Sequence, residues 1–101
     1  MYGTIATFRV KQGKEQALNE LMRSATTEVP GVVFECVFKS DKDPRNFSIV
    51  VGFESREAYR KNAESPEQHQ RYLQYRELLE TEPEWNDGEV VYTDVRAMAA
   101  S

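Results

Sequence analysis

The sequence predicts an α+β protein with the ferredoxin-like order β-α-β-β-α-β, in which the second helix is split in two. Short runs rich in β-branched and aromatic residues alternate with longer runs that carry apolar residues at helical spacing. A chain of 101 residues has the length of one domain, which we expect over residues 1–96 with a tail over residues 97–101.

The first strand and the first helix are expected between residues 2 and 31. YGTIATFRV, residues 2–10, has the composition and the length of a strand. The apolar residues of the next segment fall on one helical stripe, which consists of Ala17, Leu18, Leu21, Met22 and Ala25. Pro30 and Gly31 then interrupt the chain, so the helix should end before them.

The central part of the sequence predicts a β-hairpin followed by two helices. Residues 32–40 and 47–54 have strand composition, and the short turn DKDPRN between them indicates antiparallel pairing. Ser55 is a suitable N-cap for the first helix. The second helix begins with SPEQ, residues 65–68, which has the capping-box pattern, and is expected to end near Glu80.

The last strand and the faces of the sheet complete the expected fold. TEPEWNDG, residues 81–88, has loop composition, and EVVYTDV, residues 89–95, has strand composition. Helices in this topology cover one face of an antiparallel sheet, yet the second, third and last strands carry large apolar residues on both faces. No helix remains for the second face, so we expect a homodimer that packs sheet against sheet.

Composition and charge argue against several classes of function. The formal net charge is −4 and no basic stripe is present, which disfavours binding to nucleic acid or to an anionic membrane. No apolar run is long enough to span a membrane and the first residues do not resemble a signal peptide, so a cytoplasmic location is expected. The single cysteine, Cys36, lies in an apolar run and is expected to be a buried, inert thiol. The sequence contains no metal cluster, nucleotide motif or nucleophile–base pair, so neither a metal nor a cofactor is predicted.

Three stretches give the sequence a resemblance to a known family. They are VKQGKEQALNELM, PGVVFECVF and GFESREAYRKNAESPEQHQRY, and the resemblance extends over residues 2–95. The chain resembles the antibiotic biosynthesis monooxygenase family of dimeric α+β barrel proteins. This resemblance implies two subunits whose sheets close into a shared barrel, with a ligand pocket between sheet and helices in each. Some members oxidise phenols or quinols with O2 and without metal or flavin, and others degrade haem.

Three positions depart from the haem-degrading members, so haem degradation is not expected. Asn62 stands where those members carry a tryptophan, Tyr72 where they carry the iron-binding histidine, and Ala6 where they carry an asparagine. Many other relatives have a histidine at the position of Asn62. Its absence here keeps a non-catalytic protein of the same fold open beside the reaction without cofactor.

Asn62 is the first candidate site residue. It shares one side of a helix with Ala58, Tyr59 and Ala63, and this side should face the sheet. An unpaired buried amide costs about 1–3 kcal/mol, so Asn62 either bonds nearby backbone groups or meets a ligand. Tyr59 is a further candidate for ligand binding on the same side.

The other candidates follow later in the chain. His69, the only histidine, is either solvated or an acid or base in the pocket. Tyr72 either packs in the core or offers its hydroxyl to a ligand. Trp85 either closes the pocket as a loop lid or packs its loop onto the body. Three arginines are either surface residues or contacts for an anionic substrate: Arg9, Arg71 and Arg76.

The sequence leaves several functions open. The first is a cofactor-independent monooxygenase for a small phenol or hydroquinone, with Asn62 and Tyr72 holding the oxygen atoms and His69 taking the proton. The second is a non-catalytic dimer of the same fold that binds a small apolar molecule or has a structural role. An isomerase or decarboxylase on the same scaffold is the third.

Overall fold

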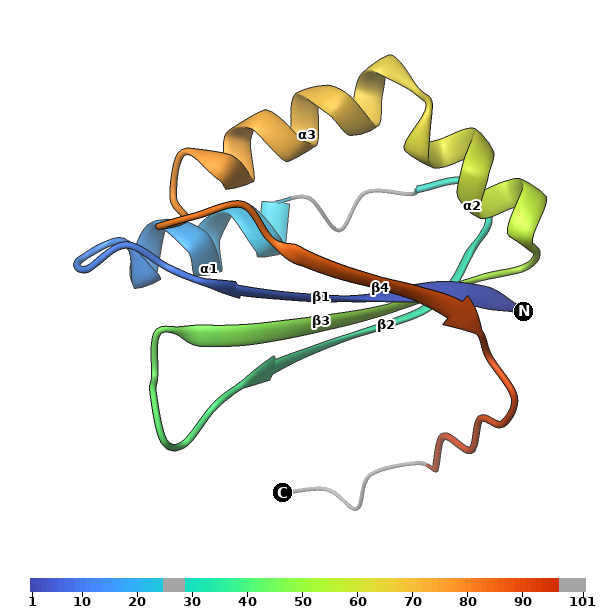
Figure 1. Ribbon diagram of the computed structural model, residues 1–101, viewed down its shortest axis with the longest axis horizontal. Coiled ribbons are helices and arrows are strands. Elements are labelled where there is room, and N and C mark those ends of the chain that lie inside the picture. Colours follow the sequence, from blue (N-terminus) through green and yellow to red (C-terminus); the bar gives the residue numbers. More distant parts are fainter. Residues whose placement is uncertain (25–28, 97–101) are drawn as a thin grey trace.

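The computed structural model of the protein describes residues 1–24 and 29–96. The elements follow in the order β1 (Tyr2–Arg9), α1 (Glu15–Ser24), β2 (Val32–Lys39), β3 (Asn46–Phe53), α2 (Arg56–Ala63), α3 (Pro66–Arg76) and β4 (Glu84–Glu89) (Figure 1). This order confirms the predicted fold class and the split second helix. Ala25 of the predicted stripe and the expected tail lie outside the described residues.

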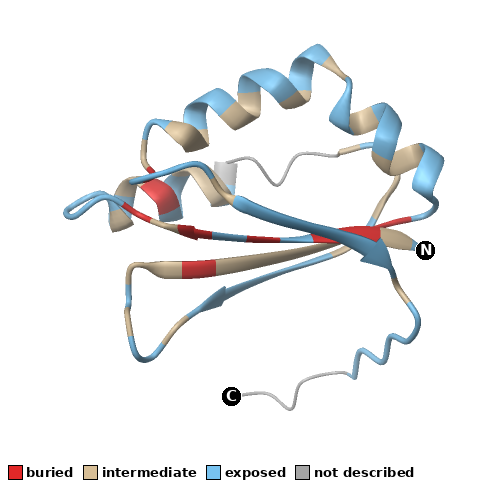
Figure 2. Cartoon of the chain, viewed as in Figure 1, coloured by how far each residue is buried: buried red, intermediate tan, exposed pale blue. Residues whose placement is uncertain are grey.

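The strands form an antiparallel sheet in the order β2-β3-β1-β4, and the described helices lie over one face of it (Figure 1). The central strand β1 pairs with β3 on one side and with β4 on the other. β2 pairs with β3 in the antiparallel manner that the short turn predicts. Figure 2 shows that burial is concentrated on β1, while β2 and β4 are largely exposed.

The buried core lies between α1 and one end of the sheet. Leu18, from the predicted helical stripe, is fully buried against the rings of Phe8 and Phe47. These two phenylalanines lie opposite each other on β1 and β3, and their ring centroids are 5.9 Å apart. Val10 and Leu79 complete this cluster from the segments that follow β1 and α3.

Two predicted boundaries near the end of the chain are wrong. α3 ends at Arg76 rather than near Glu80, because Leu79 forms an antiparallel bridge with Val10 and is held in the core. β4 occupies residues 84–89, of which 84–88 were expected to form a loop, and residues 90–95 of the expected strand form no strand. The bridge at Leu79 explains the shift, since a chain that turns back there meets β1 at residue 84. β1 begins at Tyr2, which lies opposite Glu89, so the residues after Glu89 have no β1 residue opposite them.

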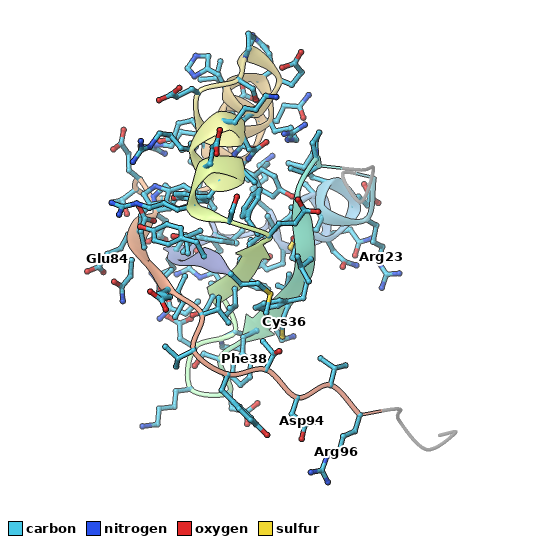
Figure 3. All side chains as sticks on the ribbon, turned by 90° about the vertical axis from the view of Figure 1, so that its right-hand side faces the viewer. Arg23, Cys36, Phe38, Glu84, Asp94 and Arg96 are labelled. Carbon is cyan, nitrogen blue, oxygen red and sulfur yellow. The ribbon has the colours of Figure 1, made fainter. Side chains whose placement is uncertain are left out.

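A β-bulge in β2 decides which of its residues face the helices. The register shifts between Val32 and Phe34, so that Glu35, Val37 and Lys39 lie opposite the helix-facing residues of β3. Cross-strand neighbours share a face of the sheet. Phe34, Cys36 and Phe38 therefore point to the face without helices, and Figure 3 shows Cys36 and Phe38 on that side. Cys36 is exposed in the chain, so the prediction of a buried thiol is wrong.

The face without helices, called the open face below, carries an apolar patch on β1, β2 and β3. Register places five apolar side chains on it: Ile5, Phe34, Cys36, Phe38 and Val50. Phe38 is 67% exposed, which is unusual for a phenylalanine on a regular strand. None of the helices in the described part of the chain is long and apolar enough to cross a membrane.

Candidate functional site

A cavity of about 550 Å³ lies between the sheet and the helices α2 and α3. Its floor consists of side chains that alternate along the central strands: Thr4, Ala6, Ile49, Val51 and Phe53. Its roof consists of polar and aromatic side chains of the two helices: Tyr59, Asn62, His69, Arg71, Tyr72 and Tyr75. The volume and the mixture of apolar walls with a few polar groups fit a small-molecule site.

The structure brings four of the candidate residues predicted from the sequence to this one cavity. Tyr59 and Asn62 come from α2, and His69 and Tyr72 come from α3. Trp85 also lines the cavity, but from β4 and half exposed rather than from a loop. The cavity lies where the family resemblance implies a ligand pocket.

The junction of α2 and α3 is fixed by Ser65, the predicted N-cap. The Ser65 hydroxyl accepts a hydrogen bond from the backbone N–H of Gln68 at 3.1 Å and donates to the carbonyl of Asn62 at 2.8 Å. The backbone N–H of Ser65 donates to the same carbonyl at 3.0 Å. This N–H has a partner, so the Gln68 side chain does not close the capping box. It is free to turn toward the cavity.

Asn62, Gln68 and Arg71 form a hydrogen-bonded network at the cavity roof. Asn62 Nδ2 donates to Gln68 Oε1 at 3.3 Å, and Arg71 Nη2 donates to Asn62 Oδ1 at 3.2 Å. Arg71 Nε and Nη2 both donate to Gln68 Oε1, at 3.2 and 3.1 Å. The Asn62 amide is thus satisfied by side chains and not by the backbone groups considered from the sequence.

Tyr59 is held as a neutral hydrogen-bond donor. Its hydroxyl donates to Asp87 Oδ1 at 2.8 Å, and its ring contacts those of Tyr2 and Phe53, each with centroids 5.4 Å apart. Burial, followed by the bond to Asp87, raises the pKa of Tyr59 to about 12. Burial and the charge of Glu35 raise the pKa of Tyr75 as well. Neither phenol is therefore a base at neutral pH.

His69 and Tyr72 present polar groups that have no partner within residues 1–24 and 29–96. His69 is exposed, and its imidazole forms no hydrogen bond with that part of the chain. Tyr72 is half-buried, and its hydroxyl forms none either. Side-chain nitrogen and oxygen atoms that are buried there all have partners, so the Tyr72 hydroxyl is open to solvent or a ligand. Both groups are available to a bound molecule.

Sequence reasoning missed Gln68 and Asp87 as cavity residues, and it considered Arg71 only as a surface residue or a contact for an anionic substrate. The serine and the glutamine of SPEQ are three residues apart, and this spacing predicts a helix cap. It does not predict that the glutamine side chain points into the cavity. Asp87 was assigned to a loop because its segment has loop composition. Within the described ranges, no group of three or more histidine, cysteine, aspartate or glutamate residues is placed to hold a metal ion.

Comparisons with solved structures show the same fold in several proteins. One from Chloroflexus aurantiacus, provisionally assigned as an antibiotic biosynthesis monooxygenase, has a TM-score of 0.77 and 22% identity over 93% of this chain and 96% of that one. Rv0793 from Mycobacterium tuberculosis has a TM-score of 0.75 and 18% identity, over 93% and 98% of the two chains. SnoaB from Streptomyces nogalater, a cofactor-independent oxygenase, has a TM-score of 0.76 and 15% identity, over 91% and 94%.

The sequence itself matches a family model. The model for the antibiotic biosynthesis monooxygenase domain matches residues 1–83, which include every candidate residue on α2 and α3. No curated protein matches the chain significantly. The solved structures share too little sequence to show more than the fold, whereas the family model covers most of the chain. The chain therefore belongs to the antibiotic biosynthesis monooxygenase family.

Proposed function

We propose that the protein is a cytoplasmic, cofactor-independent monooxygenase that oxidises a small phenol or hydroquinone with O2. The observation that carries this proposal is the cavity, which combines aromatic and apolar walls with polar groups of α2 and α3. Family membership supports an oxygenase in general, and SnoaB, which has this fold, is a cofactor-independent oxygenase. The phenolic substrate is inferred from the chemistry that these side chains can perform.

The reaction needs no electrons beyond those of the substrate. A phenol or hydroquinone with a free C–H ortho or para to its hydroxyl loses the O–H proton to a base and gives one electron to O2, which yields a phenoxyl-type radical and superoxide. The two combine at that ring carbon, and the distal oxygen takes back the proton. Loss of the ring C–H proton then breaks the O–O bond and leaves a quinone and water. The phenol loses four electrons, and O2 gains four.

The cavity residues have distinct roles in this proposal. Tyr72 donates its free hydroxyl to the phenolate oxygen, and Asn62 offers the N–H of Nδ2 that does not bond Gln68. His69 takes the phenolic proton and returns it to the peroxide. Tyr59 stays protonated and serves as an aromatic wall.

Oxygen consumption with a panel of hydroquinones and phenols tests the proposal. We expect uptake above the rate of autoxidation, with one water and one quinone formed per O2. Asn62→Ala and Tyr72→Phe should lower the rate by roughly tenfold or more, since each removes a hydrogen bond to a developing charge. Asn19→Ala, which changes an exposed asparagine on α1 away from the cavity, is the matched control. Absence of uptake with correctly folded protein would contradict the proposal, and turnover without O2 would indicate an isomerase or decarboxylase.

We propose further that two copies pack through the open face. Phe38 and Ile5 lie exposed on this face, which no described helix covers. The segment after β4 supports the same conclusion. It leaves the sheet on the side opposite the helices (Figure 1), and its strand-like residues Val91 and Val95 are each 88% exposed. A partner sheet packed there would cover both the face and the segment.

A non-catalytic binding protein of the same fold is the second candidate. It is favoured by the absence, among the described residues, of a partner that orients His69 as a base. It is also favoured by the Asn62 amide, whose oxygen already accepts from Arg71. Saturable binding of an aromatic ligand without oxygen consumption would support this candidate over the enzyme.

A further inference from the structure

We infer that Arg71 anchors an anionic oxygen of the ligand, so that the cavity selects aromatic molecules with a carboxylate or an ionised phenol over neutral analogues. This inference rests on the proposed function only in using the same cavity. It deepens that function, because it assigns the charge class of the ligand and the residue that recognises it.

A count of the N–H groups of Arg71 gives the first argument. A guanidinium has five, and three of them are engaged. The N–H of Nε and one of Nη2 donate to Gln68 Oε1, and the other of Nη2 donates to Asn62 Oδ1. Neither N–H of Nη1 has an acceptor in residues 1–24 and 29–96. Polar side-chain atoms buried in this part of the chain all have partners, so Nη1 is reached by solvent. It is free to donate to a ligand oxygen.

The charge of Arg71 gives the second argument. A guanidinium is always protonated, and no carboxylate of the described residues forms an ion pair with this one. Arg9 and Arg45, by contrast, are paired with Asp43 and Glu80.

The two acidic residues of the cavity do not compensate Arg71. Asp87 accepts a hydrogen bond from Tyr59. The charges of Glu35 and Arg71 both act on Tyr75, but Glu35 forms no ion pair with Arg71. A half-buried positive charge at the wall of an apolar cavity attracts an anion more strongly than the same charge in water.

The network around Arg71 gives the third argument. Gln68 and Asn62 accept from two edges of the guanidinium and so fix its plane before a ligand arrives. An arginine held in this way loses less side-chain entropy on binding. Asn62 then acts as a positioning residue for Arg71 in addition to any direct contact, which accounts for an amide in an apolar stripe.

Binding measurements on two matched pairs of probes test the inference. The carboxylate pair is 2-naphthoate and 2-naphthamide, and the phenolate pair is ionised 4-nitrophenol and 4-nitroanisole, all at one pH without O2. Isothermal titration should show that wild-type protein prefers the anionic member of at least one pair by about tenfold or more. The pair with the larger preference identifies which anionic oxygen the site takes.

Substitutions at Arg71 assign the preference to this residue. Arg71→Gln should bind both members of the pair about equally, and Arg71→Lys, which keeps the charge, should retain part of the preference. Arg60→Gln removes the same charge from an exposed position on α2 and should behave as wild type. Loss of a neutral ligand's affinity together with that of the anion would indicate only a structural role.

Three results would overturn the inference: no preference in wild type, a full preference in Arg71→Gln, or no binding of any probe to folded protein. The outcome is separate from that of the oxygen measurement. A charge preference without oxygen uptake would refute the proposed reaction but support the role of Arg71. Oxygen uptake without a charge preference would support the reaction but refute the role of Arg71.

Discussion

Replacing Phe38 with glutamate tests whether a second copy covers the open face. Phe38 is 67% exposed on β2. A phenylalanine has about 200 Å² of surface to bury, so roughly 130 Å² is available in each protomer. At about 25 cal/mol per Å², complete burial would contribute roughly 3 kcal/mol per protomer and 6 kcal/mol in a twofold dimer.

Packing need not bury all of this area for the effect to be large. Half of it, about 3 kcal/mol, corresponds to an increase of roughly 100-fold in the dissociation constant of the dimer. A glutamate buried in an apolar interface adds a desolvation cost to this loss. We therefore expect Phe38→Glu to dissociate at protein concentrations at which the wild type is dimeric.

Sedimentation velocity over a range of concentrations measures the effect. Leu73→Glu is the matched control, since Leu73 is 43% exposed on α3, on the helical side of the sheet, and should not change the dissociation constant. Circular dichroism shows whether each variant is folded. The reasoning fails if Phe38→Glu associates as tightly as wild type, or if wild-type protein is a stable monomer at micromolar concentrations.

Three further predictions concern stability. Leu18→Ala empties a site that is 0% exposed and should lower the free energy of unfolding by about 2–5 kcal/mol in urea; an unchanged midpoint would place Leu18 outside the core. The pKa of Asp43 is lowered by the backbone N–H of Arg45 and then by Arg9, so its stabilisation is present above the ordinary value of 3.8 and fades as the pH falls through the lowered one. Asp43→Asn should consequently lose less thermal stability than wild type on acidification, and equal losses would count against this. Burial and the bond to Asp87 raise the pKa of Tyr59 to about 12 in the native state. Between pH 10.0 and that value, wild type should therefore lose more thermal stability than Tyr59→Phe, and an equal loss would contradict the raised pKa.

The candidate site was only partly predictable because its members depend on different kinds of information. Asn62 and Tyr59 were found through the helical side that they share, and a helical period decides which side of α2 faces the sheet. The link from Asn62 to Arg71 runs between two helices and through Gln68. No pattern along the chain predicts that the Gln68 side chain, which does not close the capping box, lies between Asn62 and Arg71.

The sequence itself determined the order of the helices and strands, because each of these elements depends on interactions between residues that are close in the chain. Ser55 and Ser65 cap the helices that they were expected to cap, because an N-cap bond joins residues three apart. The apolar period likewise placed Leu18 in the core.

Strand register and the direction of side chains were decided only in the tertiary structure. The bridge between Val10 and Leu79 fixes where the returning chain meets β1, and it outweighs the stronger strand composition of residues 89–95. A one-residue bulge after Val32 turns Cys36 from the expected core to the open face. Both depend on hydrogen bonds between residues far apart in the chain. Composition has little influence on them, because a shift of one residue reverses the face of every side chain that follows.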